Sequence, residues 1–153
     1  MIFLRLRKKE MAVWEKTSGS KIPDNAIRAG YEKDGKPLFI ARAKMGGLWT
    51  SGKCGTHLPG AHIPNDCKEV IVRDYDVLVY PINAVGLLDW KQASGGKVPD
   101  KAFKTDTDLY VGRANYTGSL IPCRISTSQK CAYMGYGGKE YNAKEYEVLC
   151  QIK

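Results

Sequence analysis

The stretch Trp14-Glu-Lys-Thr-Ser-Gly-Ser-Lys-Ile-Pro-Asp-Asn-Ala-Ile27 returns later as Trp90-Lys-Gln-Ala-Ser-Gly-Gly-Lys-Val-Pro-Asp-Lys-Ala-Phe103. A second match follows in the same order, because Leu-Phe-Ile-Ala-Arg-Ala at 38–43 returns as Leu-Tyr-Val-Gly-Arg-Ala at 109–114. Ordered self-similarity of this kind indicates a tandem duplication. Two equivalent surfaces suit a multivalent binder better than an enzyme with one asymmetric cleft, so we expect no enzymatic activity.

The matches divide the chain into four segments. We predict an N-terminal extension over 1–11, a first repeat over 12–80, a connector over 81–89 and a second repeat over 90–153. The connector is too apolar for a flexible linker, so the two repeats should pack against each other.

The local pattern predicts an all-β fold. Short β-prone runs are separated by glycine or proline roughly every ten residues, which leaves no room for a helix of ordinary length. Such spacing is typical of a sandwich or barrel, so we expect the repeats to pack as a β-sandwich-like unit. The first copy carries a longer segment between Ile27 and Leu38, which indicates a longer hairpin loop.

The repeated arginines Arg42 and Arg113 lie within apolar runs. A charge in such a position needs a partner, so we expect each to be half-buried and paired with a carboxylate such as Glu69 or Glu140. Trp14 and Trp90 recur faithfully and are interpreted as core anchors.

The net charge of +8 gives the leading alternative function. A basic surface attracts anionic lipid, sulfated glycan or nucleic acid. The dense basic cluster lies outside the repeats, and no recognition motif accompanies it, so we expect no specific nucleic-acid partner. Its members are Arg5, Arg7, Lys8 and Lys9.

The chain has no apolar run long enough to span a bilayer and no secretory pattern at its start. Its five cysteines are an odd number and do not occupy matching places in the two copies. Reduced thiols and a cytoplasmic location are therefore expected, with release by a signal-independent route left open, as is the choice of Met1 or Met11 as the start.

The repeated sequence blocks described above resemble the DM-nine repeat, together with Gly52-Lys53-Cys-Gly55 and the paired Tyr-Asp-Val-Leu and Tyr-Glu-Val-Leu motifs. The blocks occur in the same order in both copies. The chain is most similar to the small two-repeat lectins of molluscs that carry this repeat. The resemblance implies two packed all-β repeats, frequent homodimerisation and recognition of mannose-type glycans on microbial surfaces in innate immunity. It implies no cofactor.

The resemblance also implies a mannose pocket formed by an acidic loop residue and the lysine of the Gly-Lys-Cys-Gly turn. Here those positions fall at Glu32 and Lys53. In the second copy the lysine position becomes Arg124, and the acidic candidates are Asp106 and Asp108. We expect Lys53→Ala to abolish sugar binding while leaving the thermal transition nearly unchanged, as for a residue exposed on a turn.

Two other features have alternative interpretations. Trp49 could offer an apolar face to a sugar ring or simply pack. A metal interpretation rests on four zinc-competent side chains, although the second copy lacks them all, and we expect no metal there. They are Cys54, His57, His62 and Cys67.

Overall fold

The structure, a computed structural model, describes residues 11–81 and 87–152. The predicted N-terminal extension up to residue 10, with its basic cluster, lies outside the described residues, as do residues 82–86 of the predicted connector over 81–89. We call 11–81 the first half and 87–152 the second half. No helix long and apolar enough to cross a membrane occurs in these two stretches.

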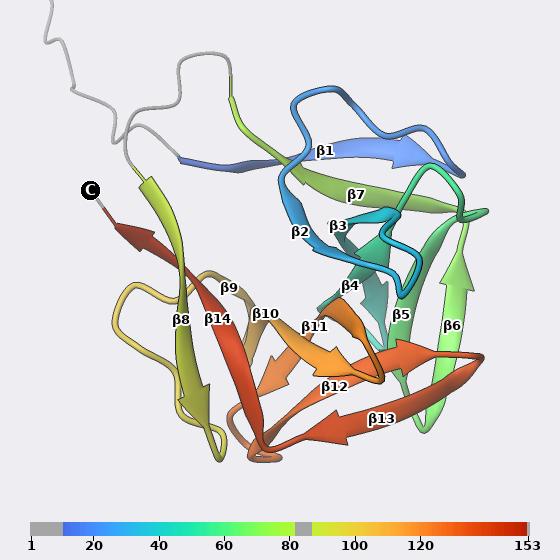
Figure 1. Ribbon diagram of the computed structural model, residues 1–153. Helices are drawn as coiled ribbons and strands as arrows, with labels where there is room; N and C mark the ends of the chain where they lie inside the picture. The colour runs from blue at the N-terminus through green and yellow to red at the C-terminus, as the bar shows by residue number, and fades with distance from the viewer. Residues whose placement is uncertain (1–10, 82–86, 153) are drawn as a thin grey trace, which may run out of the picture.

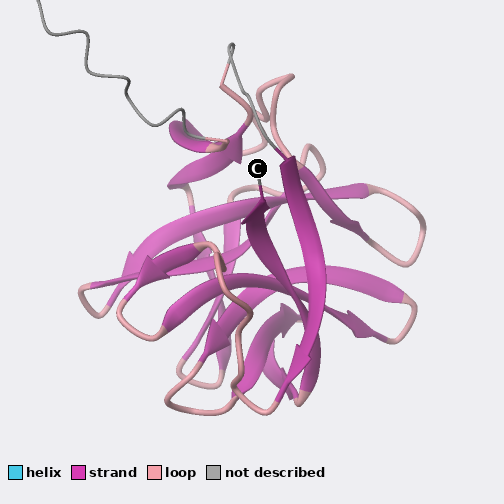
Figure 2. Cartoon of the chain, turned by 90° about the vertical axis from the view of Figure 1, so that its left-hand side faces the viewer, coloured by secondary structure: helices cyan, strands magenta, loops and turns pink. Residues whose placement is uncertain are grey.

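The described residues form strands and loops without any helix (Figure 2), which confirms the all-β prediction. The first half contains β1 (Val13–Ser18), β2 (Arg28–Tyr31), β3 (Pro37–Met45), β4 (Leu48–Cys54), β5 (Ala61–Asn65), β6 (Lys68–Val72) and β7 (Asp74–Val79). The second contains β8 (Leu87–Ser94), β9 (Lys104–Asp106), β10 (Leu109–Tyr116), β11 (Ser119–Ser126), β12 (Cys131–Tyr136), β13 (Lys139–Ala143) and β14 (Glu145–Ile152).

The strand order shows the duplication in three dimensions. It runs β1-β7-β3-β4-β5-β6 through the first half and, from the other end, β8-β14-β10-β11-β12-β13 through the second. The halves join where β6 meets β13 through the pair Lys68 and Lys139, and where Tyr31 of β2 pairs with Leu120 of β11. Figure 1 shows β1 and β7 along the top, β8 and β14 at the left, and β12 and β13 along the bottom.

The two halves share a hydrophobic core, as the apolar character of the connector predicted. One buried cluster takes equivalent residues from both halves, including Leu78 with Leu149 and Ile40 with Val111. Each half also has a cluster of its own. Burial of each such side chain contributes about 1.5–3 kcal/mol, so the shared cluster holds the halves in one sandwich-like unit.

The longer loop predicted in the first copy is confirmed. It forms the β2–β3 turn, where the Glu32 backbone N–H donates to the carbonyl of Lys36 and the Gly35 N–H donates to Glu32. The equivalent β9–β10 connection has only residues 107 and 108 between its strands. Glu32 is the first residue of this longer turn.

The predicted partners of the repeated arginines were wrong. Arg42 Nε donates to Asp76 Oδ2 over 2.9 Å, and Arg113 Nε donates to Glu147 Oε1 over 3.0 Å. Asp76 and Glu147 stand directly opposite these arginines in the β3–β7 and β10–β14 pairs. Each arginine therefore pairs with the carboxylate that faces it on the neighbouring strand, and not with the carboxylate expected from the sequence.

The repeated tryptophans pack on the shared core and also contact these arginines. The guanidinium of Arg42 stacks on Trp14 and Trp49, with its central carbon 4.6 and 4.0 Å from the ring centroids. Arg113 stacks on Trp90 in the same way, at 4.2 Å. Trp49 thus packs against Arg42, which favours its structural interpretation over a platform for a sugar ring.

Candidate functional site

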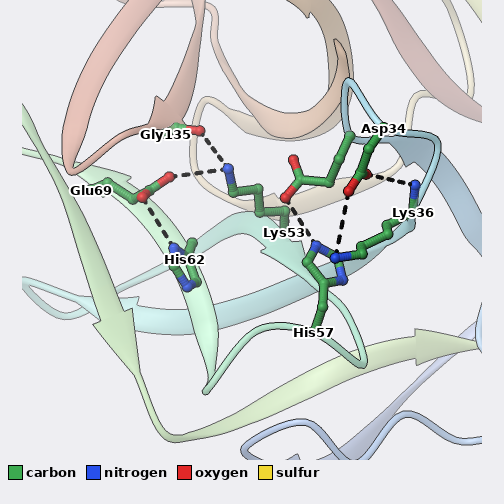
Figure 3. Close-up of polar contacts among 8 residues, drawn as sticks. Asp34, Lys36, Lys53, His57, His62, Glu69 and Gly135 are labelled. Atoms are coloured by element: carbon green, nitrogen blue, oxygen red, sulfur yellow. Dashed lines mark hydrogen bonds and ion pairs between the residues drawn. The ribbon is translucent and has the colours of Figure 1, made fainter.

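Lys53 lies inside β4 and is only 4% exposed, so it is not the exposed turn residue that the sequence suggested. Its Nζ donates to the carbonyl oxygen of Gly135 over 2.9 Å and lies 3.2 Å from Oε2 of Glu69. Figure 3 shows these contacts. An ammonium has three N–H groups, and that of Lys53 donates to Gly135 and pairs with Glu69, so Lys53 keeps hydrogen-bonding capacity for a ligand.

Glu69, on β6, pairs with Lys53 and holds its ammonium in place. Its second oxygen lies 3.0 Å from Nδ1 of His62 on β5, outside hydrogen-bond geometry. That same oxygen accepts a backbone N–H from Gly138 over 3.3 Å. Burial opposes ionisation, but His62 and Lys53 outweigh it, so the pKa of Glu69 is lowered.

Three glycines make room for this cluster. A Cβ at Gly52 would come within 2.3 Å of the His62 carbonyl oxygen, and one at Gly135 within 2.6 Å of the Glu69 carboxylate. At Gly55, a Cβ would lie 2.8 Å from the imidazole of His57. Both glycines of the Gly-Lys-Cys-Gly motif are therefore explained by close approaches that a larger residue would block.

Glu32 begins the turn after β2 and is held by an imidazole. Its Oε2 lies 2.9 Å from Nε2 of His57, which comes from the loop between β4 and β5. Asp34 and Lys36 of the same turn form an exposed pair 3.5 Å apart. Glu32 is about one-fifth exposed, so its carboxylate is held in place and still reachable from solvent.

Glu32 and Lys53 line the same open cavity, of about 530 Å³. They do not contact each other, because Glu32 faces His57 and Lys53 faces Glu69. The second half supplies part of the wall, including Ser119 and Tyr136, whose ring centroid lies 5.6 Å from Nζ of Lys53. The cavity is thus built by both halves, and most of the residues that line it are polar or charged.

The second half carries a related arrangement around Arg124 on β11. Its Nε donates to the carbonyl oxygen of Pro64 over 3.1 Å, and its Nη2 donates to Glu140 over 3.0 Å. Nη1 donates to Gln129 over 3.3 Å, and the ring of Tyr133 lies 4.2 Å from the guanidinium. Each of the three guanidinium nitrogens of Arg124 therefore has a hydrogen-bond partner within the protein.

The acidic candidates of the second half, Asp106 and Asp108, lie in different environments. Asp108 and Arg124 both line a larger cavity of about 910 Å³. Asp106 instead accepts hydrogen bonds from the backbone N–H groups of Trp49 and Thr107, each at 2.8 Å. These bonds lower the pKa of Asp106 and give it a structural role between the halves.

The two clusters exchange backbone contacts between halves. Lys53 binds the backbone of Gly135 while Arg124 binds that of Pro64, and Glu69 accepts from Gly138 while Glu140 accepts from Cys67 over 3.3 Å. Each cation–carboxylate pair is therefore completed by the opposite half. This reciprocity follows from the single point where β6 and β13 pair.

The four zinc-competent side chains are separated by the fold. His57 and His62 face different carboxylates, Cys54 is buried in the core of the first half, and Cys67 is exposed at the β5–β6 turn. Burial raises the pKa of the Cys54 thiol to about 12, which disfavours the thiolate that binds metal. No group of three or more potential ligands gathers within 11–81 and 87–152. All five cysteines are free thiols.

Sequence reasoning missed several cavity residues. Glu69 was assigned to an arginine, and its recurrence as Glu140 beside the equivalent cation was the signal that could have corrected this. His62 was not predicted to line the sugar site. Ser119 and Tyr136 belong to no recognisable sequence motif. They line the cavity of Lys53 because the two halves pack together.

The fold and the cavity define an all-β tandem-repeat protein with a polar site shared between its halves. The chain belongs to the DM9 (DM-nine) repeat family, whose profile matches residues 3–70 and 104–153. This confirms the resemblance drawn from the repeated motifs.

Curated relatives come from the fish Thalassophryne nattereri. Natterin-4 is 29% identical over 136 residues, which cover 89% of this chain and 33% of natterin-4. Natterin-2 is 28% identical over 145 residues, covering 92% of this chain and 36% of natterin-2. The chain thus spans about a third of the length of these relatives.

A solved structure has the same fold. The nematode sperm cell motility protein MFP2B aligns with a TM-score of 0.70 over 95% of this chain and 45% of the MFP2B chain. The sequence identity is only 16%, so this likeness supports the fold alone.

Proposed function

We propose that this protein is a non-catalytic lectin that binds mannose-type glycans in the cavity lined by Glu32 and Lys53. One observation carries the proposal: a held carboxylate and a buried ammonium, from different elements of the first half, line one open cavity. Family membership and the resemblance to two-repeat lectins agree with a carbohydrate-binding role.

The chemistry of the cavity suits a pyranose. Adjacent hydroxyl groups of a sugar can donate to the free oxygen of Glu32 and accept from the remaining N–H of Lys53. Each charge-assisted hydrogen bond contributes about 1.5–3 kcal/mol. The ring of Tyr136 adds an apolar surface beside Lys53.

Glu69 acts as a positioning residue in this proposal. Because it is 6% exposed and ion-paired with Lys53, it holds the ammonium in place rather than binding sugar itself. Such preorganisation reduces the free-energy cost of ordering a long side chain upon binding.

A single site of this size would bind a monosaccharide weakly, with a Kd of about 1 mM after the cost of association. Several sites on one glycan-coated surface raise avidity by about 10²–10⁴. We therefore propose that the protein recognises microbial surfaces, as a pattern receptor of innate immunity, through multivalency that a homodimer would increase.

The test is retention on immobilised mannose. Wild type should bind in about 1 M NaCl, where surface charges are screened, and free mannose should elute it. Glu32→Gln should lose retention, whereas Asp24→Asn should behave as wild type, because Asp24 is an exposed carboxylate outside the cavity. Salt-labile binding to heparin or anionic lipid without sugar competition would contradict the lectin and support the basic-surface alternative.

A further inference from the structure

Ser119 has a buried hydroxyl group with no hydrogen-bond partner. The residue is 1% exposed, and its Oγ is an unsatisfied polar atom among the described residues. Buried hydroxyl groups are normally hydrogen-bonded, and leaving one unpaired destabilises the free protein. An orphan of this kind calls for an explanation beyond packing.

The position of Ser119 in the fold supplies an explanation for its unpaired hydroxyl group. It is the first residue of β11, immediately after the Gly118 turn, and it lines the cavity that contains Glu32 and Lys53. The next residue, Leu120, pairs with Tyr31, which directly precedes Glu32. The side chain of Lys33 packs over Gly118, 3.6 Å from the position of a Cβ there. The β10–β11 hairpin is thus fitted against the turn that carries Glu32.

The duplicated half lacks this hydroxyl. Leu48 holds the equivalent position at the start of β4, is 45% exposed and lines the larger cavity. Ser119 therefore marks a chemical difference between the two cavities that the shared fold does not require. A hydroxyl group that is present in one of the two cavities, and that lacks a hydrogen-bond partner among the described residues, is suited to bind a ligand.

We propose that Ser119 is a specificity-determining residue, which hydrogen-bonds one hydroxyl group of a hexopyranose held between the halves. This rests on the lectin function proposed above and extends it, since it assigns a ligand contact to the second half. A serine hydroxyl both donates and accepts, as a sugar hydroxyl does, so the pair satisfies both groups.

The proposal also separates the two cavities in function. Each guanidinium nitrogen of Arg124 already has a partner within the protein, and Leu48 stands in place of the serine, so the larger cavity lacks the unpaired hydroxyl of Ser119. The cavity of Glu32, Lys53 and Ser119 should therefore bind the hexose with higher affinity than the larger cavity does. The duplication has produced two unequal sites rather than two copies of one.

The experiment is a calorimetric titration of wild type and Ser119→Ala with methyl α-mannoside and its four monodeoxy analogues. Ser119→Ala should weaken binding of the parent sugar by about tenfold, the effect of one hydrogen bond. It should leave unchanged the affinity for the one analogue that lacks the partner hydroxyl. Its Tm should equal or exceed that of wild type, because the substitution removes an unsatisfied group.

Ser51→Ala is the matched control. Ser51 is also fully buried, but its hydroxyl donates to the carbonyl of Cys123 over 2.9 Å. Ser51→Ala should therefore lower the Tm while keeping the order of affinities among the analogues.

Three results would overturn the assignment. If wild type binds mannose but Ser119→Ala loses affinity equally for all analogues, or for none, Ser119 is not the specificity-determining residue. The proposed lectin function then stands. A fall in Tm like that of Ser51→Ala would show a structural partner for the hydroxyl. Absence of wild-type binding to every sugar would overturn both proposals.

Discussion

Lys53 of the first half donates a hydrogen bond to the carbonyl oxygen of Gly135 in the second half, with a nitrogen–oxygen distance of 2.9 Å. The carboxylate that pairs with Lys53 passes over the same glycine. The cation at the candidate site is therefore held in place by the opposite half, which makes sugar binding and the packing of the halves interdependent.

Gly135→Ala should disturb the site from the other half. The added Cβ would lie 2.6 Å from Oε2 of Glu69, so the carboxylate must shift away from Lys53. We expect a loss of about 1–3 kcal/mol in the free energy of unfolding, together with weaker mannose binding. Gly95→Ala is the control, since it strains a left-handed turn with φ of 64° but meets no atom within 4 Å. Unchanged mannose affinity in Gly135→Ala would argue against the shared site.

Lys53→Met should strongly destabilise the protein. It leaves Glu69 buried without its cation, which costs about 3–5 kcal/mol in unfolding free energy by urea denaturation. This replaces the expectation from sequence that Lys53→Ala leaves the thermal transition unchanged. Lys36→Ala, which breaks the exposed pair with Asp34, should cost less than about 1 kcal/mol.

The double variant Lys53→Met with Glu69→Leu isolates the origin of that loss. Removing both charges leaves no unpaired buried ion, so stability should recover toward the wild-type value while mannose binding stays lost. If the double variant were as unstable as Lys53→Met, lost packing rather than the uncompensated charge would be responsible.

Acidification should remove stability through Glu69. Since the folded-state pKa is lowered, the ion pair contributes above the unfolded pKa of about 4.3, and the contribution disappears as pH falls through the folded value. The Tm of wild type should therefore fall more than that of Glu69→Gln between about pH 6 and about pH 3. Parallel Tm curves for the two proteins would show that Glu69 does not titrate in this way.

Glu32 substitutions probe binding with little effect on stability. Glu32 is partly exposed and contacts only His57 through its carboxylate, so Glu32→Gln should change unfolding free energy by less than about 1 kcal/mol. Its mannose affinity should fall by about tenfold or more. Glu32→Asp keeps the charge and should preserve or sharpen mannose selectivity, as measured on a panel of hexoses.

The fold was predictable because its signals are local and occur twice. Matching runs from Trp14 and Trp90 onward defined strands, turns and the packing of the halves. For the candidate site, family resemblance named Glu32 and Lys53, and both residues line one cavity of the structure. That this cavity binds sugar stays a prediction. Burial of Lys53 and its pairing with Glu69 depend on strand register, which spacing along the chain does not encode.

The contribution of the second half could not be read from sequence. Gly135 reaches Lys53, and Ser119 reaches the cavity, because β6 meets β13 and β2 meets β11, and these contacts join residues far apart in the chain. A one-residue change of register would turn Ser119 to the other face. Its unsatisfied hydroxyl becomes visible only when every neighbour is in place.

A crystal structure of the protein saturated with mannose tests the central claim most directly. We predict a single hexose in the cavity, with hydroxyl oxygens within about 3.2 Å of the Glu32 carboxylate and of Nζ of Lys53. A mannose bound elsewhere on the protein, or a cavity left without sugar at saturating concentration, would contradict the account.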